Sequence, residues 1–186
     1  MSDERNERAR YVHLFTTVGY IAAFSALAFL ATTFVRIPLP VSGGYFNIGD
    51  TFVMAAGALF GPIAGFFVGL IGPTASDAIG YPVFVPATAI IKSLEGLIVG
   101  IIAYKQTGGS ASRVLLSVVV GAVIIVCGYF AFEGYIYPIL SHYSPFFNAT
   151  NFGSAIGELV PNAIQALISA VLAFGLWQIF GSKRGK

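Results

Sequence analysis

The stretch Gly72–Gly100, GPTASDAIGYPVFVPATAIIKSLEGLIVG, places two acids and one lysine inside an otherwise apolar segment. The rest of the chain has the same character. Of its 186 residues, 56% are hydrophobic and 10% are charged, whereas an ordinary soluble domain has about 25% charged residues. The composition therefore indicates an integral membrane protein, in which Asp77, Lys92 and Glu95 need a specific explanation.

Apolar runs recur along the whole chain, whereas a cleaved signal peptide would place one only at its start. Crossing a hydrocarbon core of about 30 Å takes about 20 residues in a helix. The second run is short for this and ends at the helix-breaking pair Gly61-Pro62. We expect an all-α membrane protein with six transmembrane helices, over residues 11–35, 51–60, 62–79, 86–104, 113–132 and 154–180.

The distribution of basic residues predicts the orientation, because Lys and Arg in short loops are retained on the cytoplasmic side. With six spans, one side carries Arg5, Arg8, Arg10, Lys105, Arg113, Lys183, Arg184 and Lys186. The other side carries only Arg36. Both termini are therefore predicted to be cytoplasmic. We expect a polar tail over residues 1–10, at the membrane surface or disordered, a membrane domain over 11–181 and a basic tail over 182–186.

Several function classes find no support in the sequence. No basic stripe alternates with aromatic residues, so we expect no nucleic-acid partner. The single cysteine, Cys127, excludes an intramolecular disulfide and a thiolate metal site. His13 and His142 are predicted on opposite sides, and neither HExxH nor GxxxxGK[ST] occurs. We therefore expect no metal, no catalytic residue, and no cofactor or ATP held by this chain.

The predicted outer loops are long, nearly uncharged and rich in aromatic residues. These are Tyr45, Phe46, Tyr81, Phe84, Tyr135, Tyr137, Tyr143, Phe146 and Phe147. An interfacial aromatic belt accounts for some of them. So many on one side also suits loops that close over a flat ligand by ring stacking.

Small residues at a spacing of four predict close helix contacts. Gly57, Gly61, Gly65 and Gly69 form one such series, and packing within the bundle is the favoured interpretation. Ala22 and Ala26 form an AxxxA pair in the first helix. For this pair, contact with a partner protein competes with packing inside the bundle.

Inserting a charged residue at membrane depth costs about 2.5 to 3.5 kcal/mol of free energy. Such residues therefore usually face the protein interior and pair with other polar groups. We expect Lys92 to form an ion pair with Glu95 or Asp77 that ties the third and fourth helices together. This interpretation is preferred over direct ligand contact. The three charges would then position the helices that frame a site.

A polar stripe on the last helix points to a ligand. Glu158, Asn162 and Gln165 lie at i, i+4 and i+7 on an otherwise apolar helix, so they share one face. Tyr129 and Glu133 lie four residues apart near the outer end of the fifth helix. Together these groups could bind a small polar heterocycle, or they could form hydrogen bonds between helices.

Six segments, RIPLP, GGYFNIGD, ALFGPIAG, GLIGPTASDAIGY, IIKSLEGLIVG and VPNAIQALISA, occur in this order. They resemble an S component of an energy-coupling factor (ECF) vitamin transporter, in the riboflavin-type branch that includes proposed hydroxymethylpyrimidine and pyridoxine transporters. The resemblance covers residues 12 to 180. It implies a multi-pass protein of a prokaryotic plasma membrane that works with a transmembrane T component and two ATP-binding subunits. Ala22 and Ala26 fit the family's contact with the T component.

The resemblance also implies where the vitamin binds, near the outer surface. With the polar stripe, it gives as substrate-binding residues Tyr45, Phe46, Asn47, Tyr81, Tyr129, Glu133, Tyr137, Asn162 and Gln165. Asp77, Lys92, Glu95 and Glu158 are expected to be structural charges. Pyridoxine or hydroxymethylpyrimidine is the favoured cargo, ahead of riboflavin, and the loaded subunit is expected to topple in the membrane to release it.

Two other function classes remain open. In a self-sufficient secondary carrier, Asp77, Glu95 or Glu133 would titrate with a coupling proton, but the chain has no clear internal repeat of the kind such carriers have. An intramembrane enzyme would need a nucleophile and a base, which the sequence does not bring together.

Overall fold

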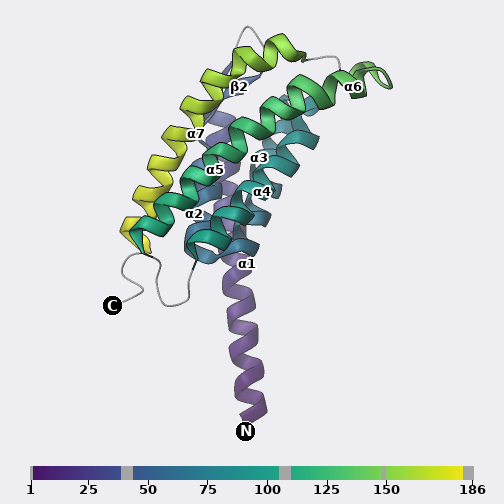
Figure 1. Cartoon of the computed structure of the whole chain (residues 1–186). Helices are drawn as coiled ribbons and strands as arrows, with labels where there is room; N and C mark the ends of the chain where they lie inside the picture. The colour runs from purple at the N-terminus through teal and green to yellow at the C-terminus, as the bar shows by residue number, and fades with distance from the viewer. Residues whose placement is uncertain (1, 39–43, 105–109, 148–149, 182–186) are drawn as a thin grey trace.

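The computed structural model describes residues 2–38, 44–104, 110–147 and 150–181, and in these ranges nearly every residue is helical (Figure 1). The helices are α1 Ser2–Phe34, α2 Asp50–Phe60, α3 Pro62–Gly80, η1 Pro82–Phe84, α4 Val85–Ala103, α5 Ala111–Ala131, η2 Phe132–Ile136, α6 Tyr137–Ser141, η3 Pro145–Phe147 and α7 Phe152–Phe180. Two short strands, β1 Ile37–Pro38 and β2 Tyr45–Phe46, pair antiparallel between α1 and α2.

Five of the described helical segments are long and apolar enough to cross a membrane, which confirms the all-α membrane class. The 11-residue α2 rises only about 16 Å at 1.5 Å per residue. It is buried along almost its whole length against α1, α3, α4 and α7. The six-span count and the orientation of the termini stay predictions.

Glycine contacts hold α2, α3 and α4 close together. A Cβ atom on Gly65 would lie 2.2 Å from the Gly96 carbonyl oxygen, and one on Gly57 would lie 2.5 Å from the same oxygen. The chain turns from α2 into α3 at Gly61, whose φ of 97° favours glycine. The interpretation of the glycine series as bundle packing is confirmed.

The fifth helix continues beyond its predicted end at residue 132. Its axis passes from α5 through the π-helical turn η2 into α6, which ends at Ser141. Pro138 near the start of α6 has no N–H to donate. In the π turn just before it, the backbone hydrogen bonds join residues i and i+5 instead of i and i+4. Glu133 and Tyr137 therefore lie on a continuous helix and not in a loop.

Helix ends elsewhere differ less from the prediction. α1 begins at Ser2, so residues 2–10 are helical, and the division into a polar tail and a membrane domain stays a prediction. The Asn151 and Ser154 side chains cap the start of α7 by bonding to each other's backbone N–H. The basic tail over 182–186 lies outside the described residues.

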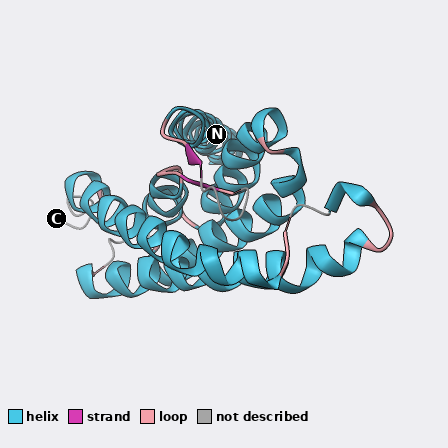
Figure 2. Cartoon of the chain, turned by 90° about the horizontal axis from the view of Figure 1, so that it is seen from above, coloured by secondary structure: helices cyan, strands magenta, loops and turns pink. Residues whose placement is uncertain are grey.

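The hairpin lies at the end of the bundle opposite to the start of α1 and the end of α7 (Figure 1). Seen from above in Figure 2, the two strands lie among the helix ends and not outside them. Hydrogen bonds from Tyr45 to Asp77 of α3 and from the Asn47 backbone to Gln165 of α7 join this segment to the helices.

Candidate functional site

A small cavity lies where the hairpin meets the helical bundle. It has a volume of about 20 Å³ and is lined by Gly44, Tyr45, Asp77, Phe84, Thr88, Tyr129, Glu133, Glu158, Asn162 and Gln165. A cavity of this size holds about one water molecule. The lining comes from the hairpin and from α3, η1, α4, α5, η2 and α7, so residues from the whole chain converge here.

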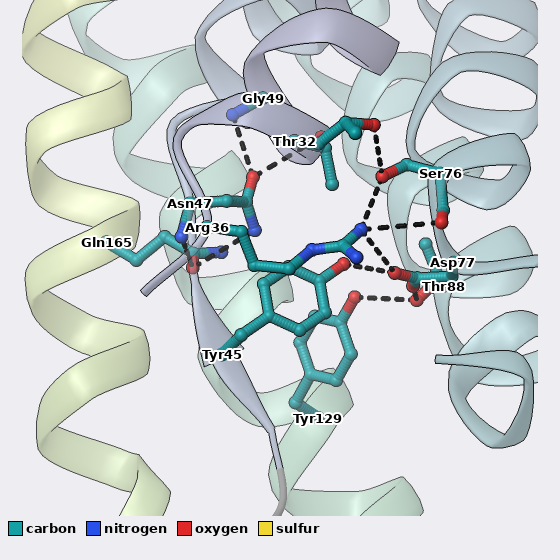
Figure 3. A network of polar contacts seen from close by, with 11 residues as sticks. Thr32, Arg36, Tyr45, Asn47, Gly49, Ser76, Asp77, Thr88, Tyr129 and Gln165 are labelled. Atoms are coloured by element: carbon teal, nitrogen blue, oxygen red, sulfur yellow. Dashed lines mark hydrogen bonds and ion pairs between the residues drawn. The ribbon is translucent and has the colours of Figure 1, made fainter. Parts of the chain in front are cut away.

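Asp77 connects three parts of the fold at one wall of the cavity (Figure 3). Its Oδ1 accepts a hydrogen bond from the Tyr45 hydroxyl, and its Oδ2 accepts one from Thr88 Oγ1 at 2.6 Å. Thr88 Oγ1 also lies 3.0 Å from the Tyr129 hydroxyl. Burial raises the pKa of the Tyr45 hydroxyl, which keeps Tyr45 a neutral donor at physiological pH.

Arg36 holds the hairpin against α3. Its guanidinium donates to Ser76 Oγ at 2.5 Å and lies 3.9 Å from Asp77 Oδ1. The same group lies 4.6 Å from the ring centre of Tyr45 and 4.8 Å from that of Tyr81, within the range of cation–π attraction. The two tyrosine ring centres are 4.7 Å apart, so Arg36 and Tyr81 position Tyr45 over the cavity.

A second polar cluster joins α7 to the residues that follow β2 (Figure 3), and it extends to Asp50 of α2. Gln165 Oε1 accepts hydrogen bonds from the Asn47 backbone N–H at 2.9 Å and from Asn47 Nδ2 at 3.3 Å. Gln165 Nε2 donates to Asp50 Oδ2 at 2.8 Å. Gln165 therefore lines the cavity and also has structural partners on both sides.

The predicted ion pair of Lys92 with Glu95 or Asp77 is wrong. Lys92 Nζ lies 2.5 Å from Asp50 Oδ1, and both side chains are buried. The reason is that α2 packs against α4 and brings Asp50 to Lys92, while Asp77 is engaged by Arg36, Tyr45 and Thr88. Glu95 is fully buried, and neither of its carboxyl oxygens has a hydrogen-bond partner in the part of the chain that the structure describes.

The predicted substrate-binding residues divide into two groups. Tyr45, Tyr129, Glu133, Asn162 and Gln165 line the cavity, and so do Asp77 and Glu158, which the sequence suggested as structural charges. The other four residues lie around the cavity without lining it: Phe46, Asn47, Tyr81 and Tyr137.

The four residues outside the lining have identifiable packing roles, and the Tyr81 ring packs beside Arg36 and Tyr45. Tyr137 is fully buried, and its hydroxyl donates to the Val83 carbonyl oxygen at 2.8 Å. Asn47 Oδ1 accepts from the Gly49 N–H at 2.8 Å, which shapes the entry to α2. Phe46 is half-buried in β2 opposite Ile37.

Only part of the aromatic cluster belongs to the site. Tyr45 and Phe84 line the cavity, and ring contacts continue from Phe84 through Tyr137 to Phe147. Tyr135 and Tyr143 are 53% and 85% exposed, as expected of residues in an interfacial belt. The outer aromatic residues therefore divide into buried rings at the cavity and exposed rings at the surface, and the closing of rings over a ligand stays a prediction.

Sequence reasoning missed Arg36, Asp50 and Thr88 as site residues, and it named Phe84 only as one of the outer aromatic residues. Arg36 carried a signal, because it is the only base on the predicted outer side. Asp50 carried another, because it directly precedes an apolar run. Thr88 has no distinguishing pattern, and its role depends on α4 lying beside α3.

The remaining predictions concern the outer surface and metals. Ala22 and Ala26 are both exposed on α1, where a partner can reach them. Within the described ranges no group of His, Cys, Asp and Glu residues is arranged to hold a metal ion.

The chain matches the family described as ECF-type riboflavin transporter, S component, over residues 14–180. A Pyrococcus woesei protein described as "Uncharacterized protein in gap 3'region" is 35% identical over 156 residues, which are 84% of this chain and 95% of that protein. A UPF0397 protein of Leuconostoc citreum (strain KM20) is 33% identical over 76 residues, 41% of this chain and 40% of that protein. Another, of Lacticaseibacillus casei (strain BL23), is 31% identical over 85 residues, 46% of each chain.

The family match spans most of the chain, including every described residue of the cavity lining. The chain therefore belongs to the ECF-type riboflavin transporter S component family, and it is a non-catalytic, multi-pass S subunit of a vitamin transporter that works with T-component and ATPase-module partners.

Proposed function

We propose that this chain captures a small aromatic vitamin or vitamin precursor, with pyridoxine or hydroxymethylpyrimidine favoured over riboflavin. The observation that carries the proposal is the cavity, which combines aromatic rings with acids, amides and hydroxyls at one end of a bundle whose outer surface is apolar. A few placed polar groups among aromatic side chains are typical of sites for small aromatic ligands.

The size of the cavity supports a small ring over a large one. At about 20 Å³, it has room for about one water molecule, so even a single ring has to displace part of the lining. Tyr45 is the part that moves in this proposal, since it belongs to a short hairpin, whereas glycine contacts fix α3 against α4. A three-ring flavin would need a larger displacement.

Delivery is proposed to use a T component and two ATP-binding subunits in a prokaryotic plasma membrane. The exposed Ala22 and Ala26 of α1 give the T component a surface that a second helix can approach closely. ATP-driven changes in the partners would then topple the loaded chain and release the vitamin inside the cell.

Reconstitution into proteoliposomes tests this proposal against the secondary-carrier alternative. Uptake of labelled vitamin is expected only when the T component, both ATP-binding subunits and ATP are all present. Vesicles that hold this chain alone should bind the vitamin without accumulating it. Accumulation by the chain alone, abolished by a proton uncoupler and independent of ATP, would contradict the proposal.

A further inference from the structure

The charges that line the cavity are unbalanced. Among the residues that the structure describes, its lining contains three carboxyl groups, from Asp77, Glu133 and Glu158, and no Lys, Arg or His. Asp77 already has partners, because it accepts hydrogen bonds from Tyr45 and Thr88 and lies 3.9 Å from the Arg36 guanidinium. The other two carboxyl groups of the lining belong to Glu133 of η2 and Glu158 of α7.

Glu133 is buried and incompletely partnered. Only 1% of its surface is exposed, and its Oε2 atom has no hydrogen-bond partner among the described residues. Glu158 lines the same cavity from α7, so two acidic side chains border the space that a ligand would enter.

The chain brings these two carboxyl groups together from different elements. Glu133 lies in the π turn η2, a helix irregularity of the kind often found at functional sites. Glu158 lies on α7 beside the hairpin, where a Cβ atom on Gly44 would lie 2.5 Å from Glu158 Oε1. The glycine lets the backbone approach the carboxyl group closely, which encloses the pair at the cavity wall.

We propose that the Glu133–Glu158 pair is the subsite that selects the charge of the ligand. It accepts a hydrogen bond from an amino group or a protonated ring nitrogen on a small aromatic ring, while Tyr45, Phe84 and Tyr129 contact the ring itself. A ligand with a carboxylate or phosphate at this position is rejected, because two like charges would meet in a site with little water. This inference rests on the proposed function and adds the substrate class.

A series of ligands that share one pyridine ring tests the inference on the unaltered protein. Pyridoxamine, pyridoxine and 4-pyridoxate carry an aminomethyl, a hydroxymethyl and a carboxylate group at the same ring position. Titration calorimetry of the detergent-purified chain should give the order pyridoxamine, then pyridoxine, then 4-pyridoxate, with at least a tenfold loss at the last step. Hydroxymethylpyrimidine, which carries a ring amino group, should bind at least as well as pyridoxine.

Variants of the two glutamates test whether the discrimination between ligands arises at this pair. Glu133→Gln and Glu158→Gln should each weaken the binding of pyridoxamine and of hydroxymethylpyrimidine at least tenfold and reduce the discrimination against 4-pyridoxate. Glu95→Gln is the matched control, because Glu95 is an equally buried glutamate that does not line the cavity. It should leave these affinities within about twofold, and thermal melting would confirm that each variant is folded.

The outcomes separate the two proposals. If the folded wild-type chain binds none of these rings, both the proposed cargo and the inference are wrong. If it binds one of them, but 4-pyridoxate binds as well as pyridoxamine or Glu133→Gln has no effect, the capture function stands and the inference is wrong.

Discussion

At the scale of single residues, the buried polar groups of the site differ in how many hydrogen bonds they can still form with a ligand. Gln165 accepts two hydrogen bonds from Asn47 and donates one to Asp50, so the fold already uses most of its amide. Asn162 lies one helical turn away on the same wall, is 6% exposed and makes no hydrogen bond to another described side chain. Asn162 is therefore the cleaner residue for testing ligand contact.

Replacing Asn162 by Leu should weaken vitamin binding about tenfold or more, which corresponds to about 1.4 kcal/mol, without lowering the melting temperature. Gln165→Leu serves as the contrast. It should weaken binding and also destabilise the fold, because it leaves buried partners of Gln165 unsatisfied at about 1 to 3 kcal/mol each. Titration calorimetry and thermal melting of the two variants measure both effects. Unchanged affinity in Asn162→Leu would place the ligand elsewhere.

The Asp50–Lys92 ion pair allows a second prediction at this scale. Lys92→Met should destabilise the protein by about 3 to 5 kcal/mol, because it leaves the fully buried Asp50 without its cation. The double variant Asp50→Asn with Lys92→Met should recover much of that loss. Unfolding in detergent measures each protein. Equal stability of the single and double variants would show that the pair does not couple α2 to α4.

At the scale of elements, the apolar runs predict most of the helices, and the exceptions have physical causes. The fifth helix was predicted to end at residue 132, where its apolar run ends, but the π turn η2 lets the helix continue to Ser141. Local sequence cannot reveal the partner of Lys92, because Asp50 is 42 residues away and reaches it only when α2 packs on α4. The i, i+4, i+7 stripe of α7 was predictable because helical periodicity alone fixes it.

Glycine packing among α2, α3 and α4 gives a prediction at this scale. Gly65→Ala should destabilise the bundle by about 1 to 3 kcal/mol, because its Cβ atom would lie 2.2 Å from the Gly96 carbonyl oxygen. Gly175→Ala is the matched control, since a Cβ atom there meets nothing within 4 Å. Melting temperatures in the same detergent should fall only for Gly65→Ala. A similar melting temperature for both variants would contradict the close packing.

At the scale of the whole molecule, the fold separates a polar cavity at the hairpin end from an apolar surface along the helices. Exposed Leu, Ile and Val side chains cover α5 and α7, including Leu116, Val123, Leu167 and Val171, which suits contact with lipid tails. No described part of that outer surface carries the cavity's polar groups. A chain built in this way can present its ligand site at one membrane face while its sides contact lipid and partner subunits.

Association with the T component should depend on the outward face of α1. Replacing Ala22 and Ala26 by Trp should abolish recovery of the T component in a pull-down, because the two rings prevent a helix from approaching closely. Vitamin binding should not change. Ala163→Trp, at an exposed position on α7, controls for added bulk and should retain association. Recovery of the T component with the α1 variant would remove this face from the interface.

Capture of a small aromatic vitamin by this chain alone can be measured by calorimetric titration. The detergent-purified chain, without partners or ATP, is titrated in parallel with pyridoxine, hydroxymethylpyrimidine and riboflavin. We predict one-to-one binding of a single-ring ligand, weakened by Asn162→Leu. If protein that melts cooperatively binds none of the three, this chain does not capture these vitamins by itself and the proposed function is wrong.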